Sequence, residues 1–399
     1  MQLVEQHVIS KSDPRHESID RAAFASKNLY NAANYLVRQA FIFQGTYLGY
    51  AEIFHLLKGH EAYCALPRKV SNDVLRLLDK NWKSFFKAIK AWKEQPELFL
   101  GRPKLPGYKD KSEGRNILIY DIQALSKTAL RKGLIAPSQL GITIQTKQQN
   151  VKQVRIIPKF THYVVEVVYE QEPQPASVDA SLVAGIDLGL DNLATLTSTK
   201  PGFVPRLISG KLLKSINQGY NKRRASLQSQ LKSRFTSRQL EQLTDKRNQR
   251  IKHLLHSASR QIIALLVAEG IGTLVIGHNP EWKQEINLGK RTNQQFVQIP
   301  HARFIQMLTY KAELVGIQVI ITEESYTSKC SFLDMEPIGK HEQYAGKRVK
   351  RGLFRSADGH RYHADVNGSY NIIRKVVPDA FGKGIVGAAV HPCRVAIAV

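Results

Sequence analysis

The pattern of apolar and polar residues predicts one strand and then two long helices in the first hundred residues. Alternation over residues 3–9 predicts a short strand, because successive side chains of a strand point to opposite faces. Apolar residues then recur at helical spacing from Ile19 to Phe43 and again from Ser71 to about Glu94. The apolar stripe of the second helix is typical of core packing. Its remaining face carries lysines, which indicates either a solvated surface or contact with phosphate.

A second pattern begins after a basic boundary. Residues 99–110 are rich in glycine and proline and therefore predict turns. From Asn116 to Tyr169 the apolar positions alternate, which predicts the strands of an antiparallel barrel or sheet. These strands fall at residues 117–119, 142–144, 154–156 and 163–169. The early strand, the helices and the return to strands together predict one β domain interrupted by a helical domain, followed by a proline-containing linker at residues 172–179.

The remaining half alternates strands with helices. Residues 183–189 form an apolar strand that ends in Asp187 beside glycine. Further strands are expected at residues 273–276 and 317–321. Helices are expected in 211–260, in 302–314 and after Asp365. Such alternation predicts an α/β layer fold, and the whole chain is expected to be a multidomain α+β protein.

Charge points to a polyanionic partner. Lysine and arginine total 58 against 33 acids in 399 residues, a formal net charge of +25. Neutralising phosphates releases counterions and strengthens binding, so nucleic acid is the expected partner. No apolar run approaches the ~20 residues that span a bilayer, and no signal peptide is evident. The three cysteines are too few for a disulfide framework, which favours a reducing cytoplasm.

The basic residues are concentrated in two segments. Residues 211–260 hold thirteen lysines and arginines and only two acids, an imbalance that a bound polyanion would relieve. Residues 347–355 form a second basic run. Contacts from either segment would position a phosphate backbone without reading bases. The candidate nucleic-acid-binding residues are Lys222, Arg223, Arg224, Lys246, Arg247, Arg250, Lys347, Arg348, Lys350 and Arg351.

Two aspartates carry the candidate chemistry. Asp187 at a strand end beside glycine could hold a divalent cation where phosphate approaches, although many strands simply end in Asp-Gly turns. Asp365 precedes a helix with Val366, Tyr370 and Ile373 on one face, so it is expected to be the N-cap. An aspartate at a helix start can cap and coordinate together, so both interpretations of Asp365 stay open.

Four short motifs follow one another along the chain. They are Gly-Arg-Pro-Lys-Leu-Pro-Gly-Tyr-Lys at 101–109, Gly-Ile-Asp-Leu-Gly-Leu-Asp-Asn at 185–192, Tyr-Thr-Ser-Lys-Cys-Ser at 326–331 and Asp-Val-Asn-Gly-Ser-Tyr-Asn-Ile at 365–372. In this order and spacing they resemble the TnpB/OrfB family of insertion-sequence proteins, which is related to type V CRISPR effectors and to Fanzor. The resemblance implies a guide RNA, a double-stranded DNA target beside a short target-adjacent motif, and hydrolysis that depends on two Mg²⁺ ions.

The resemblance also implies a domain arrangement. A wedge-like, β-barrel-like domain would comprise residues 1–15 and 111–178, with a helical recognition domain at 16–110 inserted in it. An RNase H-like (RuvC) nuclease domain would comprise 179–329 and 359–380. Between its parts would lie a degenerate zinc-finger-like insert at 330–358 that binds nucleic acid, and residues 381–399 would form a tail.

One departure from the family concerns the middle catalytic acid, usually a glutamate directly after the strand at 273–276. This chain continues with Gly277. A relocated glutamate in a Glu-x-Tyr-Thr-Ser context, as in some relatives, would be Glu324, with Asp187 and Asp365 completing the magnesium-binding catalytic set. Glu323 is the alternative, since neighbouring residues at a strand end point opposite ways. Glu281 and Glu285 are fallback candidates nearer the missing position.

The other departure concerns zinc. Relatives usually carry two cysteine pairs before the last aspartate, whereas only Cys330 remains here. A structural zinc site requires four N or S ligands in closely spaced pairs, so no zinc is expected.

Two other functions are compatible with these residues. A nuclease-inactive relative would bind target DNA through its guide and repress transcription, as the missing glutamate suggests. A cut-and-paste transposase would use the same three acids but would bind terminal repeats without RNA.

Overall fold

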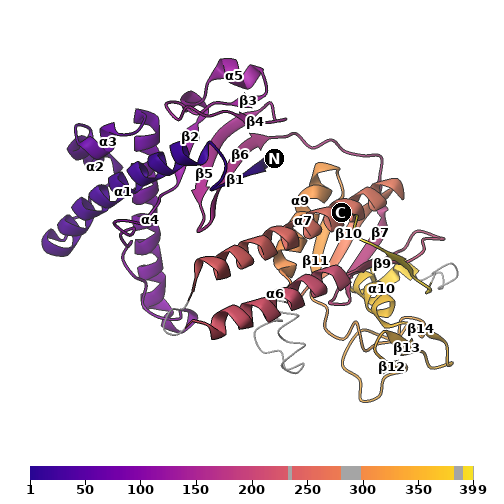
Figure 1. Cartoon of the computed structure of the whole chain (residues 1–399). Coiled ribbons are helices and arrows are strands. Elements are labelled where there is room, and N and C mark those ends of the chain that lie inside the picture. Colours follow the sequence, from indigo (N-terminus) through magenta and orange to yellow (C-terminus); the bar gives the residue numbers. More distant parts are fainter. Residues whose placement is uncertain (232–235, 280–297, 382–389, 399) are drawn as a thin grey trace. The chain divides into compact units, whose positions relative to one another are not determined.

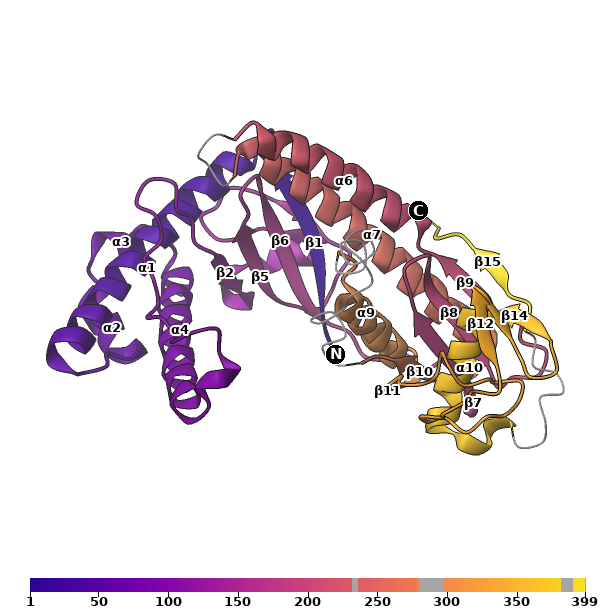
Figure 2. The same ribbon diagram turned by 90° about the horizontal axis from the view of Figure 1, so that it is seen from below.

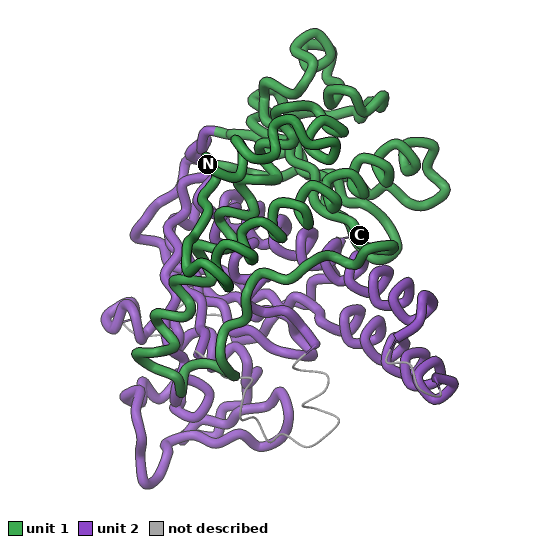
Figure 3. The backbone as a smooth tube through the Cα atoms, turned by 90° about the vertical axis from the view of Figure 1, so that its left-hand side faces the viewer, with its two compact units in different colours: residues 1–171 green, residues 172–399 purple. Residues whose placement is uncertain are grey.

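The computed structural model describes residues 1–231, 236–279, 298–381 and 390–398 (Figure 1). The chain forms two compact units, residues 1–171 and 172–399 (Figure 3). Each unit has its own hydrophobic core. Within the described ranges, no helix combines the length and the apolar character needed to cross a bilayer.

Unit 1 contains a four-stranded antiparallel sheet whose strands come from before and after a long insertion. Its order is β1 (Gln2–Ser10), β6 (His162–Glu170), β5 (Val151–Pro158) and β2 (Leu118–Asp121). The first strand pairs with the last, from Gln2 opposite Glu170 to Ser10 opposite His162. The prediction of one sheet interrupted by helices is therefore confirmed.

The strand predicted at residues 142–144 lies slightly later in the chain and belongs to a smaller sheet. The strand there is β4 (Ile144–Gln145), which pairs with β3 (Leu134–Ile135) apart from the main sheet. Two short helical segments, η2 (Ile122–Ala124) and α5 (Lys127–Arg131), precede β3. The alternation of apolar residues at 142–144 reflects burial and not pairing in the main sheet, because Ile142 and Ile144 are both buried in the core of the unit.

The insertion is helical, as its periodicity predicts. α1 (His16–Gln44) and α4 (Arg68–Glu94) bury their apolar faces together, and the indole of Trp82 donates a 3.0 Å hydrogen bond to Asn34. The short helices α2 (Tyr50–Leu57) and α3 (Glu61–Cys64) were not predicted, because eight and four residues carry too little periodic signal. After η1 (Pro96–Leu98) the chain returns along α1.

Unit 2 is built on a six-stranded mixed sheet. Its order is β11 (Gln318–Thr322), β10 (Ile271–Gly277), β7 (Asp179–Leu188), β8 (Asn192–Ser198), β9 (Arg206–Ser209) and β15 (Cys393–Val395). β7, β10 and β11 are mutually parallel, whereas β8 is antiparallel to both β7 and β9. The predicted strands at 183–189, 273–276 and 317–321 are confirmed, and β8, β9 and β15 are additional.

Helices cover both faces of this sheet (Figure 1). α7 (Arg238–Ala268) and α9 (His301–Leu314) pack on one face, against residues such as Ile186 and Leu274. α10 (Ala364–Val376) packs on the other face, against Val183 and Val275. α6 (Lys211–Ser229) lies alongside α7 (Figure 2). A three-stranded sheet of β12 (Lys347–Lys350), β13 (Leu353–Arg355) and β14 (Arg361–His363) precedes α10, and η3 (Pro378–Phe381) follows it.

α10 approaches β7 as closely as the backbone permits. A Cβ atom added at Gly185 would lie 2.5 Å from the carbonyl oxygen of Ser369 and 2.7 Å from Cγ1 of Ile373. The hydroxyl of Ser369 donates to the carbonyl oxygens of Gly185 and Thr195, at 2.9 and 3.0 Å. Glycine at 185 therefore sets the distance between the helix and the sheet.

We expect Gly185→Ala to destabilise unit 2 by about 1–3 kcal/mol, the usual cost of overpacking a core. Gly219→Ala is the matched control, because its added Cβ meets no atom within 4 Å and alanine is preferred inside a helix such as α6. Urea denaturation of both variants measures the effect. Equal stability of G185A and G219A would contradict the close approach of α10.

Candidate active site

The candidate site lies where the parallel strands of unit 2 end. β7, β10 and β11 run in the same direction, so their C-terminal ends meet at one edge of the sheet. Asp187 lies at the end of β7, on the face that α10 covers. A Cβ atom added at Gly368 of α10 would lie 2.8 Å from Oδ2 of Asp187. The carboxylate of Asp187 therefore lies directly against the helix backbone.

Glu324 reaches this edge from the segment after β11. The amide nitrogen of Glu324 donates a 2.9 Å hydrogen bond to Oδ1 of Asn279, which fixes the turn. Its Oε2 atom lies only 2.8 Å from the position that a Cβ atom of Gly277 would take. Gly277 is the last residue of β10, at the position where the resemblance to the TnpB/OrfB family implies a glutamate. The absence of a side chain there leaves room for the carboxylate of Glu324.

Glu323 points elsewhere. Its carboxylate is about half exposed and forms a 2.7 Å ion pair with Lys375 of α10. It also accepts a 3.0 Å hydrogen bond from the amide of Ser325. Of the two adjacent glutamates, Glu324 is the one that lies beside the end of β10 and influences Asp187.

Asp365 lies in the first turn of α10, but it is not the N-cap. The cap is His363, whose Nδ1 accepts a 3.2 Å hydrogen bond from the amide of Asp365. The prediction that Asp365 is the N-cap was therefore wrong, because the cap lies two residues earlier. The carboxylate of Asp365 makes other contacts instead. It accepts a 2.9 Å hydrogen bond from Asn192 and lies 3.5 Å from Nη2 of Arg348.

The charges of Glu324 and Asp365 act on Asp187. Desolvation raises the pKa of Asp187 well above its ordinary value, and the charges of Asp365 and Glu324 raise it further. Desolvation, together with the charge of Glu323, raises the pKa of Glu324 to about 7. Asp187 retains some accessible surface even though protein atoms surround its carboxylate closely. A cation at this edge would relieve both the repulsion and the desolvation.

The donor chemistry fits a hard divalent cation, because carboxylate oxygens are the ligands that Mg²⁺ prefers. The side chains nevertheless do not form a ready ligand set. Across the described ranges, no three His, Cys, Asp or Glu side chains lie together so that they could hold a metal ion. Asp365 instead makes its contacts with Asn192 and Arg348.

Two arginines of the predicted basic run also reach this edge. Arg348 of β12 lies near Asp365, and Arg351 pairs with Asp191 at 2.6 Å. Lys214 of α6 pairs with the other oxygen of Asp191. Asp191 and Asn192 were missed as site residues, although they end the motif at 185–192 that contains Asp187.

The other candidate nucleic-acid-binding residues divide into two groups. Most are exposed, namely Lys222, Arg223, Arg224, Lys246, Arg250, Lys347 and Lys350. Arg247 is half-buried, and its guanidinium donates hydrogen bonds to Oδ1 of Asn217 and to the carbonyl oxygen of Gln298, each at 2.7 Å. Glu281 and Glu285 lie outside the described residues.

The segment after the Thr-Ser motif is fixed by polar contacts. Cys330 is buried, and its thiol lies 3.6 Å from the carbonyl oxygen of Gly339. The carboxylate of Glu336 accepts hydrogen bonds from the amides of Ser331 and Ala345, at 2.7 and 2.9 Å. The amide side chain of Asn371 donates to the carbonyl oxygen of Cys330 at 2.8 Å, which attaches this segment to α10.

Comparisons with known proteins agree with this architecture. Residues 166–283 match a family model described as a probable transposase, OrfB_IS605, and residues 301–372 match the TNB domain of Cas12f1-like proteins. A TnpB-like protein, ORF457, of Acidianus two-tailed virus is 24% identical over 409 residues, covering 91% of this chain and 84% of the relative. The CRISPR-associated endodeoxyribonuclease Cas12f1 of Sulfoacidibacillus thermotolerans is 26% identical over 225 residues, covering 53% of this chain and 49% of the relative.

A solved structure has the same fold. The protein in the cryo-EM structure of the Cas12f1-sgRNA-target DNA complex aligns with a TM-score of 0.55 at 14% identity, covering 89% of this chain and 82% of that one. The fold is thus that of a multidomain α+β protein similar to Cas12f1. The resemblance of the chain to the TnpB/OrfB family, inferred from four motifs, is confirmed.

The raised pKa of Glu324 predicts that the metal-free chain loses stability as pH rises. The folded pKa of about 7 exceeds the ordinary value of 4.5, so the folded state holds this proton more tightly than the unfolded state. The contribution of Glu324 is most favourable below about pH 4.5 and worsens up to about pH 7. We expect Glu324→Gln to lose less stability than wild type between about pH 5 and pH 8, measured by urea denaturation with a chelator present.

Glu323→Gln is the matched control. The ion pair with Lys375 lowers the pKa of Glu323, so its contribution has the opposite sign and is lost as pH falls. The E323Q variant should keep most of the decrease in stability that wild type shows on going to high pH, because desolvation, the larger cause of the raised pKa of Glu324, is unchanged. An E324Q variant with wild-type pH dependence would exclude the raised pKa.

Proposed function

We propose that the chain is an RNA-guided DNA endonuclease, encoded by an insertion sequence, that hydrolyses phosphodiester bonds of target DNA next to a short target-adjacent motif. One observation carries the proposal. Asp187, Glu324 and Asp365 come from distant parts of the chain, and the charges of Glu324 and Asp365 both act on Asp187 at the end of β7, with Glu324 beside the glycine at the missing-acid position. Structural packing alone does not require two further carboxylates whose charges oppose the ionisation of Asp187.

The sheet order supports an RNase H-like (RuvC) domain. Its centre is β7, with the parallel strands β10 and β11 on one side and the antiparallel β8 on the other. We assign this domain to residues 179–329 and 359–380, with 330–358 as the insert and 381–399 as the tail. In unit 1 we assign residues 1–15 and 111–178 to a wedge-like domain and 16–110 to a helical recognition domain.

The partners follow from charge and similarity. The structure similar to this fold is named as a complex with single-guide RNA and target DNA. We infer a guide RNA and a double-stranded DNA target for this chain, and its net charge of +25 is consistent with both. The exposed basic residues of α6 and α7 would contact phosphates, and sequence would be read by guide pairing.

Asp187, Glu324 and Asp365 would hold two Mg²⁺ ions. When bound, magnesium supplies an activated water and neutralises charge on the leaving 3′ oxygen. The protein's own groups position the carboxylates and the phosphate. Packing of α10 on β7 fixes Asp187 beside the helix, Asn192 orients Asp365, and the guanidinium of Arg348 would donate to a phosphate oxygen at the same edge.

A second function has its own support. A nuclease-inactive, RNA-guided DNA-binding repressor would also resemble the TnpB family. The absence of a ready ligand set among the described side chains favours it. The endonuclease would cleave DNA and would need Glu324 to do so. The repressor would bind DNA without cleaving it.

Asp187→Ala and Glu324→Ala should each reduce cleavage by at least about 10²-fold, because metal ions stabilise the transition state by several kcal/mol. The assay is Mg²⁺-dependent cleavage of a plasmid library by chain purified with the RNA encoded beside its gene. Glu323→Ala is the matched control, because Glu323 pairs with Lys375 and not with the site. Guided binding without any cleavage by wild type would favour the repressor. Equal cleavage by wild type and E324A would exclude the relocated glutamate.

Replacing Lys222, Arg223 and Arg224 with alanine should weaken binding of the guide RNA uniformly across sequences. Each lost phosphate contact should reduce the slope of log K against log salt by roughly 0.7–0.9. Filter binding at several salt concentrations measures the slope. Arg247→Ala offers a contrast, because the internal hydrogen bonds of Arg247 predict a loss of stability with little change in slope. An unchanged slope in the triple variant would exclude phosphate contacts there.

A further inference from the structure

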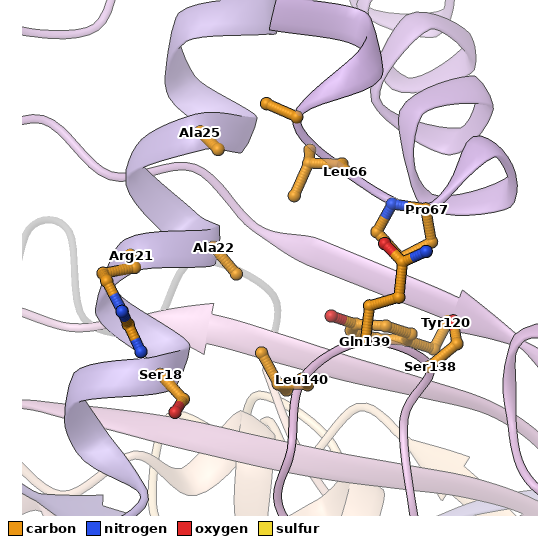
Figure 4. Close-up of a pocket in the computed structure, with 11 residues that line it drawn as sticks. Ser18, Arg21, Ala22, Ala25, Leu66, Pro67, Tyr120, Ser138, Gln139 and Leu140 are labelled. Atoms are coloured by element: carbon orange, nitrogen blue, oxygen red, sulfur yellow. The ribbon is translucent and has the colours of Figure 1, made fainter.

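The depression in unit 1 between α1, β2 and the loop before β4 does not indicate a ligand (Figure 4). Its two long polar side chains, Arg21 and Gln139, are exposed. A network of buried hydrogen bonds lies instead in unit 2, between α10 and the segment that follows Glu324.

Thr327 connects the turn that carries Glu324 to α10. Its amide nitrogen and its hydroxyl both donate hydrogen bonds to the carbonyl oxygen of Glu324, at 3.2 and 2.8 Å. Its own carbonyl oxygen accepts hydrogen bonds from the side-chain amides of Asn367 and Asn371, at 3.3 and 3.0 Å. Thr327 is only 4% exposed, so these hydrogen bonds are shielded from water. The backbone of Glu324 is thereby attached to the helix that carries Asp365.

The two asparagines are fully buried, and each makes hydrogen bonds through both ends of its side-chain amide. The carbonyl oxygen of Cys330 accepts from both, at 2.9 and 2.8 Å. Oδ1 of Asn367 accepts from the amide of Phe332 at 2.8 Å, and Oδ1 of Asn371 accepts from Arg374 at 3.0 Å. Burying an amide side chain is costly unless its groups are paired, and here they are paired with the segment after Glu324. The asparagines therefore fix one position of that segment on α10.

The turn that the network holds is strained. Tyr326 adopts φ +64°, in the left-handed region that bulky residues rarely occupy. Such a conformation persists only where surrounding contacts determine it, and it is concentrated at functional sites. Hydrogen bonds flank Tyr326 on both sides. Thr327 donates back to Glu324, and the amides of Lys329 and Cys330 both donate to the carbonyl oxygen of Tyr326 at 3.0 Å.

The position of the Glu324 carboxylate depends on this backbone. Across the described ranges, no side chain or amide donates a hydrogen bond to that carboxylate, whereas both backbone polar groups of Glu324 are paired, the amide with Asn279 and the carbonyl oxygen with Thr327. Glu324 also lies two residues beyond the end of β11, which is Thr322. A residue at the end of β10 would be held by the strands on either side, but Glu324 lacks that support. A site on a loop needs contacts of its own to be precise.

We propose that Thr327, together with Asn367 and Asn371, positions Glu324 for cation binding beside Asp187. The inference rests on the proposed function, because it assigns the network to the placement of a catalytic acid. All three are positioning residues, since they act through the backbone of Glu324. The hydrogen bonds that strands would give to a glutamate after β10 are replaced by hydrogen bonds from side chains of α10.

Thr327→Val tests the proposal, because it removes the hydroxyl and nearly keeps the shape of the side chain. Thr273→Val is the matched control. The hydroxyl of Thr273 donates a hydrogen bond of the same length, 2.8 Å, to the carbonyl oxygen of Ala180, and the residue is 5% exposed. It lies near the start of β10, away from the site. Both variants should therefore lose similar stability in urea, and only T327V should respond differently to Mg²⁺.

We expect T327V to raise the Mg²⁺ concentration for half-maximal cleavage roughly three- to tenfold, the effect of one hydrogen bond, at unchanged affinity for target DNA. The second readout is independent of cleavage. It is the rise in melting temperature of the RNA-bound chain with Mg²⁺, measured relative to Asp187→Ala to remove the effect of Mg²⁺ bound elsewhere. This rise should move to higher Mg²⁺ by the same factor. Thr327→Ser keeps the hydroxyl and should restore both readouts.

A double variant makes the test specific to Glu324. In a Glu324→Gln background, T327V should cause no further change in the Mg²⁺-dependent rise, because the carboxylate that it positions is already lost. Asn371→Ala should weaken the response to Mg²⁺ in the same direction as T327V, and it too should have no further effect in the E324Q background.

The outcomes separate this inference from the proposed function. Guided cleavage by wild type with equal Mg²⁺ responses of T327V and T273V, or with additive effects of T327V and E324Q, would overturn only the positioning role. If wild type binds Mg²⁺ at the site without cleaving DNA, the endonuclease proposal fails, and a weaker response of T327V alone would still support positioning. The absence of any Mg²⁺ effect in both readouts would overturn both.

Discussion

The packing of α10 against β7 is the contact on which the candidate site depends. It places Asp187 directly against the backbone of Gly368, and Asp365 lies on the first turn of the same helix. Asp187 is thereby held where its charge is disfavoured, by desolvation and by the charges of Asp365 and Glu324. Apolar packing offsets the free-energy cost of holding this charge, since Val366, Tyr370 and Ile373 are fully buried. The stability of the core thus maintains an arrangement of charges that would otherwise separate.

The proposed relocation of a catalytic acid is compatible with the same geometry. Parallel strands end at one edge, so a side chain from the end of β11 can replace one lost from the end of β10. The replacement needs space, and Gly277 provides it, because any Cβ atom there would lie within 2.8 Å of Oε2 of Glu324. In the proposed relocation, the absence of the usual glutamate and the position of Glu324 would therefore be two parts of one change. A larger residue at 277 would oppose the inward orientation of Glu324.

The sequence predicted most of this fold because its periodic segments are long. α1, α4, β6 and β7 each have enough residues for their period to be unambiguous, whereas α3 and β9 do not. Asp187 and Asp365 were identified from local motifs. The choice between Glu323 and Glu324 rested on motif context, and the contact of Glu323 with Lys375, fifty-two residues away, could not be read from it. The network around Thr327 was not predicted either, because its hydrogen bonds join residues forty or more positions apart.

The absence of a ready metal-ligand set among the described side chains is compatible with the proposed chemistry, because the contact of Asp365 with Arg348 is weak. Its distance to Arg348 is 3.5 Å, too long for a strong hydrogen bond, and Arg348 is about half exposed. Exposed ion pairs contribute about 0–1 kcal/mol, so little free energy opposes their exchange. A guanidinium binds phosphate bidentately at least as well as it binds a carboxylate. A phosphate of bound DNA would therefore replace Asp365 as the partner of Arg348. The carboxylate of Asp365 would then be available to a cation beside Asp187.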